Sequence, residues 1–160
     1  MAALHIRPAT ADDAALILRL IRDLARYERA EDAVQTDEAG LRASLFGPGA
    51  SAHGLICEAD AQPVGYAVYF YNYSTWLGRN GLYLEDLYVA PEHRGSGAGK
   101  ALLRHLARQA LAEGCGRFEW SVLDWNQPAI EFYQDAGAQA QDEWTVYRLQ
   151  GEALARFAAG

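Results

Sequence analysis

The chain has 160 residues, of which 51% are apolar and 22% charged, and its formal net charge is −7. This length fits one domain with a single core, and the composition is that of a globular protein rather than a disordered or fibrous one. The negative charge argues against nucleic-acid binding and is compatible with a cationic substrate. No apolar run approaches the roughly 18 residues of a membrane span, and no signal peptide is recognisable. We therefore expect a cytoplasmic protein that does not bind membranes.

Cysteine and histidine spacing indicates neither a disulfide framework nor a metal site. Cys57 and Cys115 lie far apart in the sequence and form no Cys-x-x-Cys pair. The histidines show no spacing typical of metal ligands, so we expect no metal. They are His5, His53, His93 and His105.

Hydrophobic periodicity predicts helices and strands in an uneven alternation. The expected helices run from the Thr10-x-x-Asp13 capping box to about residue 28, over 36–45, from the glycine loop to about 114, and over 128–136. The expected strands are 4–7, 52–59, 63–73, 82–89, 118–123 and 144–149. A turn at 60–63 indicates an antiparallel hairpin between the second and third strands. Together these elements predict an α+β domain with a mixed, mainly antiparallel sheet.

A glycine-rich loop follows the strand at 82–89 and precedes a helix whose leucines recur at 102, 103 and 106. It reads Arg94-Gly95-Ser96-Gly97-Ala98-Gly99-Lys100. Glycines leave backbone N–H groups uncovered, and a helix N-terminus adds unsatisfied donors and a positive dipole end, so this loop is suited to phosphate. The spacing matches neither a P-loop nor a dinucleotide fingerprint. An ordinary tight turn is the alternative interpretation.

A second informative cluster lies near the C-terminal end, where Asn126 precedes a helix that begins at Pro128. Tyr133 falls on the same helix face as Ala129 and Ile130, which would direct it inward. Taken alone, this pattern is also that of a core tyrosine whose hydroxyl has a partner.

Both clusters resemble the signature motifs of the GNAT acetyltransferases. The pattern Arg94-x-x-Gly97-x-Gly99 resembles their coenzyme A pyrophosphate loop, and Asn126-x-x-Ala129-x-x-Phe132-Tyr133 resembles the element after their fifth strand. The resemblance implies the GNAT acyltransferase fold, with six to seven strands flanked by about four helices. It also implies a single N-acetyltransferase domain over residues 1–160 that uses acetyl-CoA as cosubstrate.

Further segments resemble the diamine acetyltransferase group, which contains the spermidine/spermine enzymes and their thialysine-acetylating relatives. They are Tyr27-Glu28, Tyr73-Ser74-Thr75-Trp76, Tyr83-Leu84-Glu85-Asp86, Leu123-Asp124-Trp125-Asn126-Gln127 and Gln150-Gly151-Glu152-Ala153. Ser74 replaces an acidic residue of the spermidine/spermine enzymes, which favours the thialysine N-epsilon-acetyltransferase branch. The implied acceptor is the primary amine of a small diamine or lysine-like molecule, with thialysine favoured and polyamines next. A homodimer is implied by the family alone.

The reaction itself requires a base and an acid. A primary amine of pKa about 10.4 is neutral in only about one molecule in 2,500 at pH 7, a deficit near 4.6 kcal/mol. Glu85 is the candidate base, acting directly or through water, and a solvated strand carboxylate is its alternative interpretation. The departing thiolate needs a proton, which a tyrosine hydroxyl can donate, and Tyr133 is the candidate acid.

The resemblance also implies which residues bind the two substrates. For the cofactor they are Leu87, Tyr88, Val89, Arg94, Gly95, Ser96, Gly97, Ala98, Gly99, Lys100, Asn126, Ala129 and Tyr133. For the acceptor they are Tyr27, Glu28, Trp76, Glu85, Asp86, Glu119, Trp120 and Ser121. Trp76 could contact the acceptor by cation–π interaction or be a core or dimer-interface aromatic. Whether Glu143 contributes to the acceptor site is open.

Two other functions stay possible at this point. A protein or peptide N-acetyltransferase of the same fold would need an open groove instead of an enclosed acidic pocket. A non-catalytic acetyl-CoA-binding module would bind the cofactor without turnover, although the presence of both Glu85 and Tyr133 argues against it. The sequence does not identify the physiological amine, the regulation or the pathway.

Overall fold

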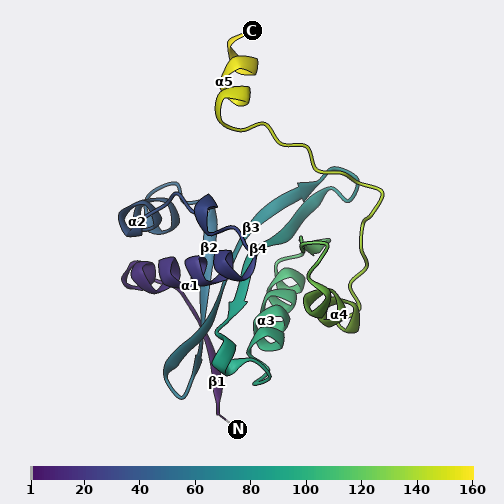
Figure 1. Ribbon diagram of the computed structural model, residues 1–160. Coiled ribbons are helices and arrows are strands. Elements are labelled where there is room, and N and C mark those ends of the chain that lie inside the picture. Colours follow the sequence, from purple (N-terminus) through teal and green to yellow (C-terminus); the bar gives the residue numbers. More distant parts are fainter. Residues whose placement is uncertain (1) are drawn as a thin grey trace. The chain divides into compact units, whose positions relative to one another are not determined.

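The computed structural model describes residues 2–160 (Figure 1). Two compact units make up the structure, one ending at Ser121 and the other spanning Val122–Gly160. The first unit contains the sheet and three α-helices, and the second contains two further α-helices.

The sheet of the first unit has five strands in the order β1-β2-β3-β4-β5. The strands are β1 (Leu4–Pro8), β2 (Ala52–Ala59), β3 (Gln62–Ser74), β4 (Arg79–Val89) and β5 (Phe118–Trp120). Neighbouring strands are antiparallel except β4 and β5, which are parallel. This confirms the α+β class and the mixed, mainly antiparallel sheet, with five strands instead of the predicted six to seven.

Helices cover both faces of this sheet (Figure 1). α1 (Ala14–Tyr27) and α2 (Glu38–Phe46) lie on one face, and α3 (Ala98–Ala112) lies on the other. Short 3-10 turns occur at Ala11–Asp13, Glu31–Ala33 and Pro91–His93. None of the helices in residues 2–160 is long and apolar enough to cross a membrane.

The core beneath α1 and α2 is built from apolar residues at helical spacing that pack on alternate residues of the strands. Its buried members are Ile17, Leu18, Leu20, Leu41, Leu45, Ile56, Tyr66 and Tyr88. On the opposite face, α3 buries Leu102, Leu103 and Leu106. The two helical layers hold β3 and β4 at the centre of the sheet, which gives the end of β4 a rigid support.

The start of the first helical region is held by an ion-pair network. The Thr10 backbone N–H donates to the Asp13 carboxylate at 2.8 Å, as the predicted capping box requires. Arg7 donates to the same carboxylate at 2.8 and 2.9 Å and to Glu58 at 2.7 Å. This network joins β1, β2 and the turn before α1.

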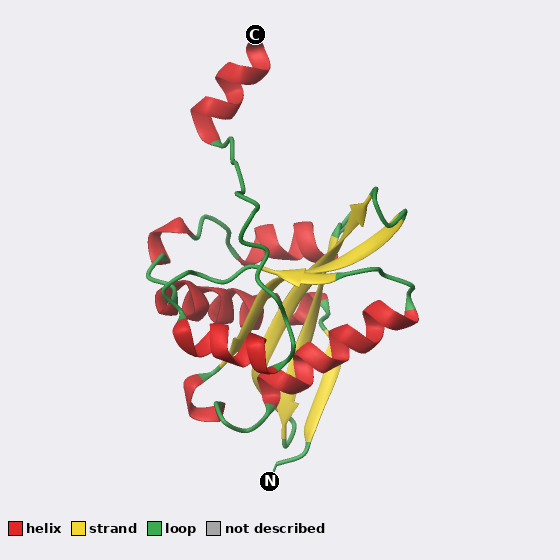
Figure 2. Cartoon of the chain, turned by 90° about the vertical axis from the view of Figure 1, so that its right-hand side faces the viewer, coloured by secondary structure: helices red, strands yellow, loops and turns green. Residues whose placement is uncertain are grey.

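The second unit contains α4 (Gln127–Asp135) and α5 (Gly151–Ala159). The prediction of a strand at 144–149 was wrong, because the structure assigns no strand to that segment; Figure 2 shows the coil that leads to α5. A strand needs a hydrogen-bonding neighbour, and the described residues pair none with it. Its side chains stay exposed, as in Val146 at 83% and Tyr147 at 94%. α5 was not predicted and brings the number of α-helices in the described residues to five.

Candidate functional site

The predicted phosphate loop has the backbone that its glycines require. Gly95 and Gly97 adopt φ angles of 82° and 88°, in the left-handed region that disfavours other residues. Gly97 is the N-cap of α3, so the first N–H groups of that helix have no partner within it. A Cβ atom at Gly95 or Gly97 would meet no protein atom within 4 Å. The loop therefore has open space beside its backbone donors, as a bound phosphate group would need.

Arg94 links this loop to the end of α1. Its guanidinium carbon lies 5.1 Å from the centre of the Tyr27 ring and 5.5 Å from that of Tyr88. Its Nε atom donates to the Val89 carbonyl at 3.1 Å. Tyr27, Tyr88 and Arg94 line a surface groove, and its other lining residues are Asp23, Arg26 and Pro91. The predicted cofactor residues Tyr88, Val89 and Arg94 thus adjoin the predicted acceptor residue Tyr27.

Strand β4 contains a β-bulge at Glu85. Asp86 pairs with Val68 of β3, but the next pair joins Leu84 to Tyr69, so the register between the two strands skips Glu85. A bulge increases the local twist and changes the direction of a side chain, and bulges are common beside active sites. The Glu85 side chain is exposed. The candidate base therefore lies at an irregularity of the strand immediately before the cofactor loop.

Pairing between β4 and β5 is short and stops just before this bulge. It covers only three residue pairs, from Leu82 with Phe118 to Leu84 with Trp120. Among the described strands, β4 has no neighbour on the β5 side from Glu85 to Val89. The backbone groups that Leu87, Tyr88 and Val89 direct to that edge have no strand partner there and could bind an extended ligand, although the Val89 carbonyl already accepts from Arg94 Nε.

Two acidic side chains lie near one another in this region. The half-buried Asp86 accepts a hydrogen bond from the buried Tyr66 hydroxyl at 2.8 Å. Burial raises the pKa of Asp86, and the Tyr66 hydrogen bond opposes that rise. Burial and then the charge of Asp86 raise the pKa of Glu28. In the part of the chain that the structure describes, no ion pair joins Glu28 or Asp86 to a Lys or Arg side chain.

Other predicted acceptor residues lie elsewhere in the first unit. Trp76 lies in the β3–β4 turn and is 82% exposed. The start of β4 at Arg79 is separated from Asp86 by about 23 Å at roughly 3.3 Å per residue, so this chain does not bring Trp76 to the acidic pair. Ser74 accepts a hydrogen bond from the Leu77 backbone N–H at 3.1 Å and so supports the turn.

The β5 candidates are placed by their pairing with β4. Glu119 and Trp120 lie opposite Tyr83 and Leu84, respectively. The Ser121 hydroxyl is 2.7 Å from the Tyr83 hydroxyl. These three residues adjoin the point where the two strands separate.

The remaining candidates belong to the second unit. Asn126 is the N-cap of α4, and Ala129 and Tyr133 lie within that helix. The centre of the Tyr133 ring lies 5.5 Å from that of Phe132. Glu143 lies in the coil between α4 and α5. The roles of these residues stay predictions.

Sequence reasoning missed two features of the site, the bulge at Glu85 and the hydroxyl of Tyr66. No local sequence pattern reports a bulge, because it depends on how two strands align. Tyr66 is recognisable in the sequence only as an apolar position of a strand, since its hydroxyl partner lies on the neighbouring strand.

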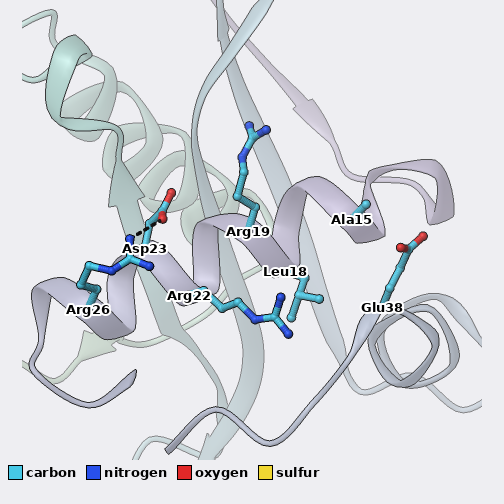
Figure 3. Close-up of a pocket in the computed structure, with 7 residues that line it drawn as sticks. All are labelled: Ala15, Leu18, Arg19, Arg22, Asp23, Arg26 and Glu38. Atoms are coloured by element: carbon cyan, nitrogen blue, oxygen red, sulfur yellow. Dashed lines mark hydrogen bonds and ion pairs between the residues drawn. The ribbon is translucent and has the colours of Figure 1, made fainter. Parts of the chain in front are cut away.

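A further groove runs along the outer side of α1 (Figure 3). Arg19, Arg22 and Arg26 surround it, and Arg26 pairs with Asp23 at 3.2 Å. The groove offers positive charge beside the carboxylates of Asp23 and Glu38. It shares Asp23 and Arg26 with the groove at Arg94, but none of the predicted site residues lines it.

The sequence and the structure of the chain are both similar to those of known proteins. The sequence model described as the acetyltransferase (GNAT) family matches residues 17–138. The chain is 43% identical to thialysine N-epsilon-acetyltransferase of Sus scrofa over 99% of both chains. It is 31% identical to L-ornithine N5-acetyltransferase of Arabidopsis thaliana, over 94% of this chain and 86% of that protein. An integron cassette protein from V. cholerae has a similar structure, with a TM-score of 0.83, 25% identity, and coverage of 100% and 99% of the two chains.

Proposed function

The chain belongs to the GNAT family of N-acetyltransferases, and on this basis we propose that it transfers an acetyl group from acetyl-CoA to a small diamine or lysine-like molecule. Thialysine is the favoured acceptor and polyamines come next. The names of the Sus scrofa and Arabidopsis thaliana relatives support this order, because thialysine and ornithine are both amino acids with a primary amine on the side chain.

The observation that carries the proposal is the acidic pair of Glu28 and Asp86. Burial raises the pKa of both carboxyl groups, and neither is joined to a Lys or Arg among the described residues. A cationic acceptor would supply the missing charge and favour the ionised carboxylates. Asp86 lies on β4, the strand that leads to the cofactor loop, so the pair would hold the second charged group of the acceptor while its reacting amine meets the thioester.

The residues present suit acetyl-CoA, which when bound supplies a reactive acetyl thioester. The loop from Arg94 to Lys100 would hold the pyrophosphate through its N–H groups and two cationic side chains. The free edge of β4 at Leu87, Tyr88 and Val89 would hold the extended pantetheine arm through backbone hydrogen bonds. We assign Asn126, Ala129 and Tyr133 to the cofactor as part of the same proposal.

In the proposed reaction, Glu85 accepts a proton from the acceptor ammonium, directly or through water, and the neutral amine attacks the acetyl carbon. The bond from the acetyl carbon to sulfur breaks as Tyr133 donates its hydroxyl proton to the departing sulfur, and the tyrosinate takes up the second proton that the nitrogen loses as the amide forms. Direct transfer is favoured over an acyl-cysteine intermediate. Burial raises the pKa of both Cys57 and Cys115, which reduces the fraction of reactive thiolate.

The whole chain would act as one acetyltransferase domain, since the family match at residues 17–138 includes parts of both compact units. A homodimer is part of the proposal. The exposed apolar side chains of the 144–149 segment support it, since they would be buried by a partner.

The deciding experiment follows the release of coenzyme A thiol with thialysine, lysine, ornithine, putrescine, spermidine and spermine at equal concentrations. We expect turnover with thialysine first. A preference for spermidine would mean that the site acetylates polyamines rather than lysine-like amino acids. Acetyl-CoA binding with no turnover across the panel would contradict the proposal and favour a peptide acceptor or a non-catalytic sensor.

A further inference from the structure

The buried hydroxyl of Tyr66 contacts Asp86, one member of the acidic pair. Tyr66 lies on β3 with 0% of its surface exposed, and its ring packs in the core with Ile17, Ile56 and Tyr88. Val68 is the register partner of Asp86, so Tyr66 is displaced by two residues along the same face of β3. This diagonal arrangement brings its hydroxyl to 2.8 Å from Asp86 Oδ2.

The hydrogen bond has a defined direction. An ionised carboxylate can only accept, so the Tyr66 hydroxyl is the donor. The surrounding core fixes the Tyr66 ring and therefore the position of its hydroxyl. The hydrogen bond then restricts rotation of the Asp86 carboxylate. Such a fixed donor stabilises the charged form of Asp86, whereas burial disfavours that form.

We propose that Tyr66 is a positioning residue for acceptor selection, whose hydroxyl keeps the Asp86 carboxylate ionised and oriented toward the cationic acceptor. The inference rests on the proposed function and adds a specificity role for a residue outside the reacting groups. It predicts that the Tyr66 hydroxyl affects the recognition of positive charge and leaves the chemical step unchanged.

The test compares two acceptors with the same carbon chain that differ by one charged amino group, 1,5-diaminopentane and n-pentylamine. In wild-type enzyme the diamine should have the higher kcat/KM. The Tyr66→Phe variant keeps the ring and should raise KM for the diamine about tenfold, the usual scale for a lost hydrogen bond to a charged group. The kcat for the diamine, the KM for n-pentylamine and the KM for acetyl-CoA should stay unchanged.

Tyr69→Phe is the matched control. Tyr69 is also buried on β3, but its hydroxyl accepts a hydrogen bond from Gln109 at 3.0 Å and does not contact Asp86. This variant should keep the wild-type preference for the diamine. Thermal unfolding of both variants would show whether the fold is retained.

A double-mutant cycle separates a positioning role from a structural one. In an Asp86→Asn background, Tyr66→Phe should have no further effect on the diamine preference, because the hydroxyl acts through the carboxylate. If Tyr66→Phe changes the diamine preference equally in the wild-type and Asp86→Asn backgrounds, the inference is overturned. If a variant is poorly active, the same cycle can be measured through the dissociation constant of the diamine instead of through turnover.

The outcomes distinguish this inference from the proposed function. If wild-type enzyme acetylates neither of these amines nor thialysine, the proposed function is overturned and the role of Tyr66 falls with it. If wild-type enzyme prefers the diamine and Tyr66→Phe keeps that preference, only the role of Tyr66 is overturned.

Discussion

The guanidinium carbon of Arg94 lies 5.1 Å from the centre of the Tyr27 ring, and this contact joins the loop after β4 to the last turn of α1. Tyr88 lies near the same guanidinium, at 5.5 Å. A cation placed between two aromatic rings is held in orientation as well as in position. The contact therefore links the proposed cofactor side of the site to its proposed acceptor side.

Replacing Arg94 should weaken the binding of acetyl-CoA. Arg94→Ala removes a charge from the proposed pyrophosphate loop and should raise KM for acetyl-CoA about tenfold, the scale of one charge-assisted hydrogen bond. Arg94→Lys keeps the charge without the planar group and should have an intermediate effect. Steady-state kinetics at varied acetyl-CoA concentration measures this KM for both variants. Arg42→Ala, on the outside of α2, is the control. Equal KM values for all four proteins would remove Arg94 from the cofactor site.

The backbone of the loop can be tested at Gly97. A residue other than glycine in the left-handed region costs about 1–2 kcal/mol, and the new Cβ of Gly97→Ala would also occupy the space proposed for phosphate. Gly49→Ala is a matched control, because Gly49 also has a positive φ, 77°, with no atom near its Cβ position. Both variants should unfold at lower temperature, but only Gly97→Ala should raise KM for acetyl-CoA. A KM increase in both would mean that general destabilisation causes the effect.

Much of the first unit could be predicted because its signals are local. Apolar residues at helical spacing mark α1 and α3, and glycines mark the loop at 95–99, where the structure has the positive φ angles that only glycine adopts easily. The five strands of the sheet were also predicted, although β4 begins at Arg79 and β5 ends at Trp120. In each case the residues that decide the structure are close together in the sequence.

The errors concern features that depend on a distant part of the chain. The 144–149 segment has the composition of a strand, but a strand forms only where a neighbour is available to pair with it. The bulge at Glu85 and the contact between Tyr66 and Asp86 follow from the alignment of β3 with β4. Neither could be predicted from a pattern within one element.

The ion-pair network at Arg7 should make stability depend on pH. Arg7 holds the pKa of Asp13 below its ordinary value of 3.8, so the native state binds fewer protons than the unfolded state near that pH. The network therefore stabilises the protein above about pH 4 and is lost as the pH falls through the native pKa of Asp13. Asp13→Asn should lower the free energy of unfolding at pH 7 by about 1–3 kcal/mol.

Urea unfolding at pH 7 and at pH 3 measures this effect. The difference between wild-type protein and Asp13→Asn should shrink at pH 3, because below pH 3.8 the unfolded state binds a proton at Asp13 that it must release to fold. Asp12→Asn changes the exposed neighbouring carboxylate and should have little effect at either pH. A difference that stays constant with pH would show that the charge of Asp13 is not the cause.

The proposed homodimer predicts a mass of about 35 kDa in solution, twice the 17.6 kDa of one chain. Light scattering after size exclusion measures it directly. Val146→Asp places a charge in the exposed apolar segment and should shift the mass toward one chain, because an unpaired charge at an interface is unfavourable. Asp142→Asn, just before the segment, is the control. A mass of one chain for the wild-type protein would contradict the homodimer.

Tyr133→Phe tests the proposed acid. The departing thiolate would lose its proton donor, and kcat should fall about 10²–10⁴-fold, the usual range for general acid catalysis. The KM for acetyl-CoA should stay nearly unchanged, because the ring and its packing against Phe132 are kept. Tyr69→Phe again serves as the control for loss of a tyrosine hydroxyl. A Tyr133→Phe variant with wild-type kcat would remove Tyr133 from the chemical step, whereas a rise in KM for acetyl-CoA alone would limit its role to cofactor binding.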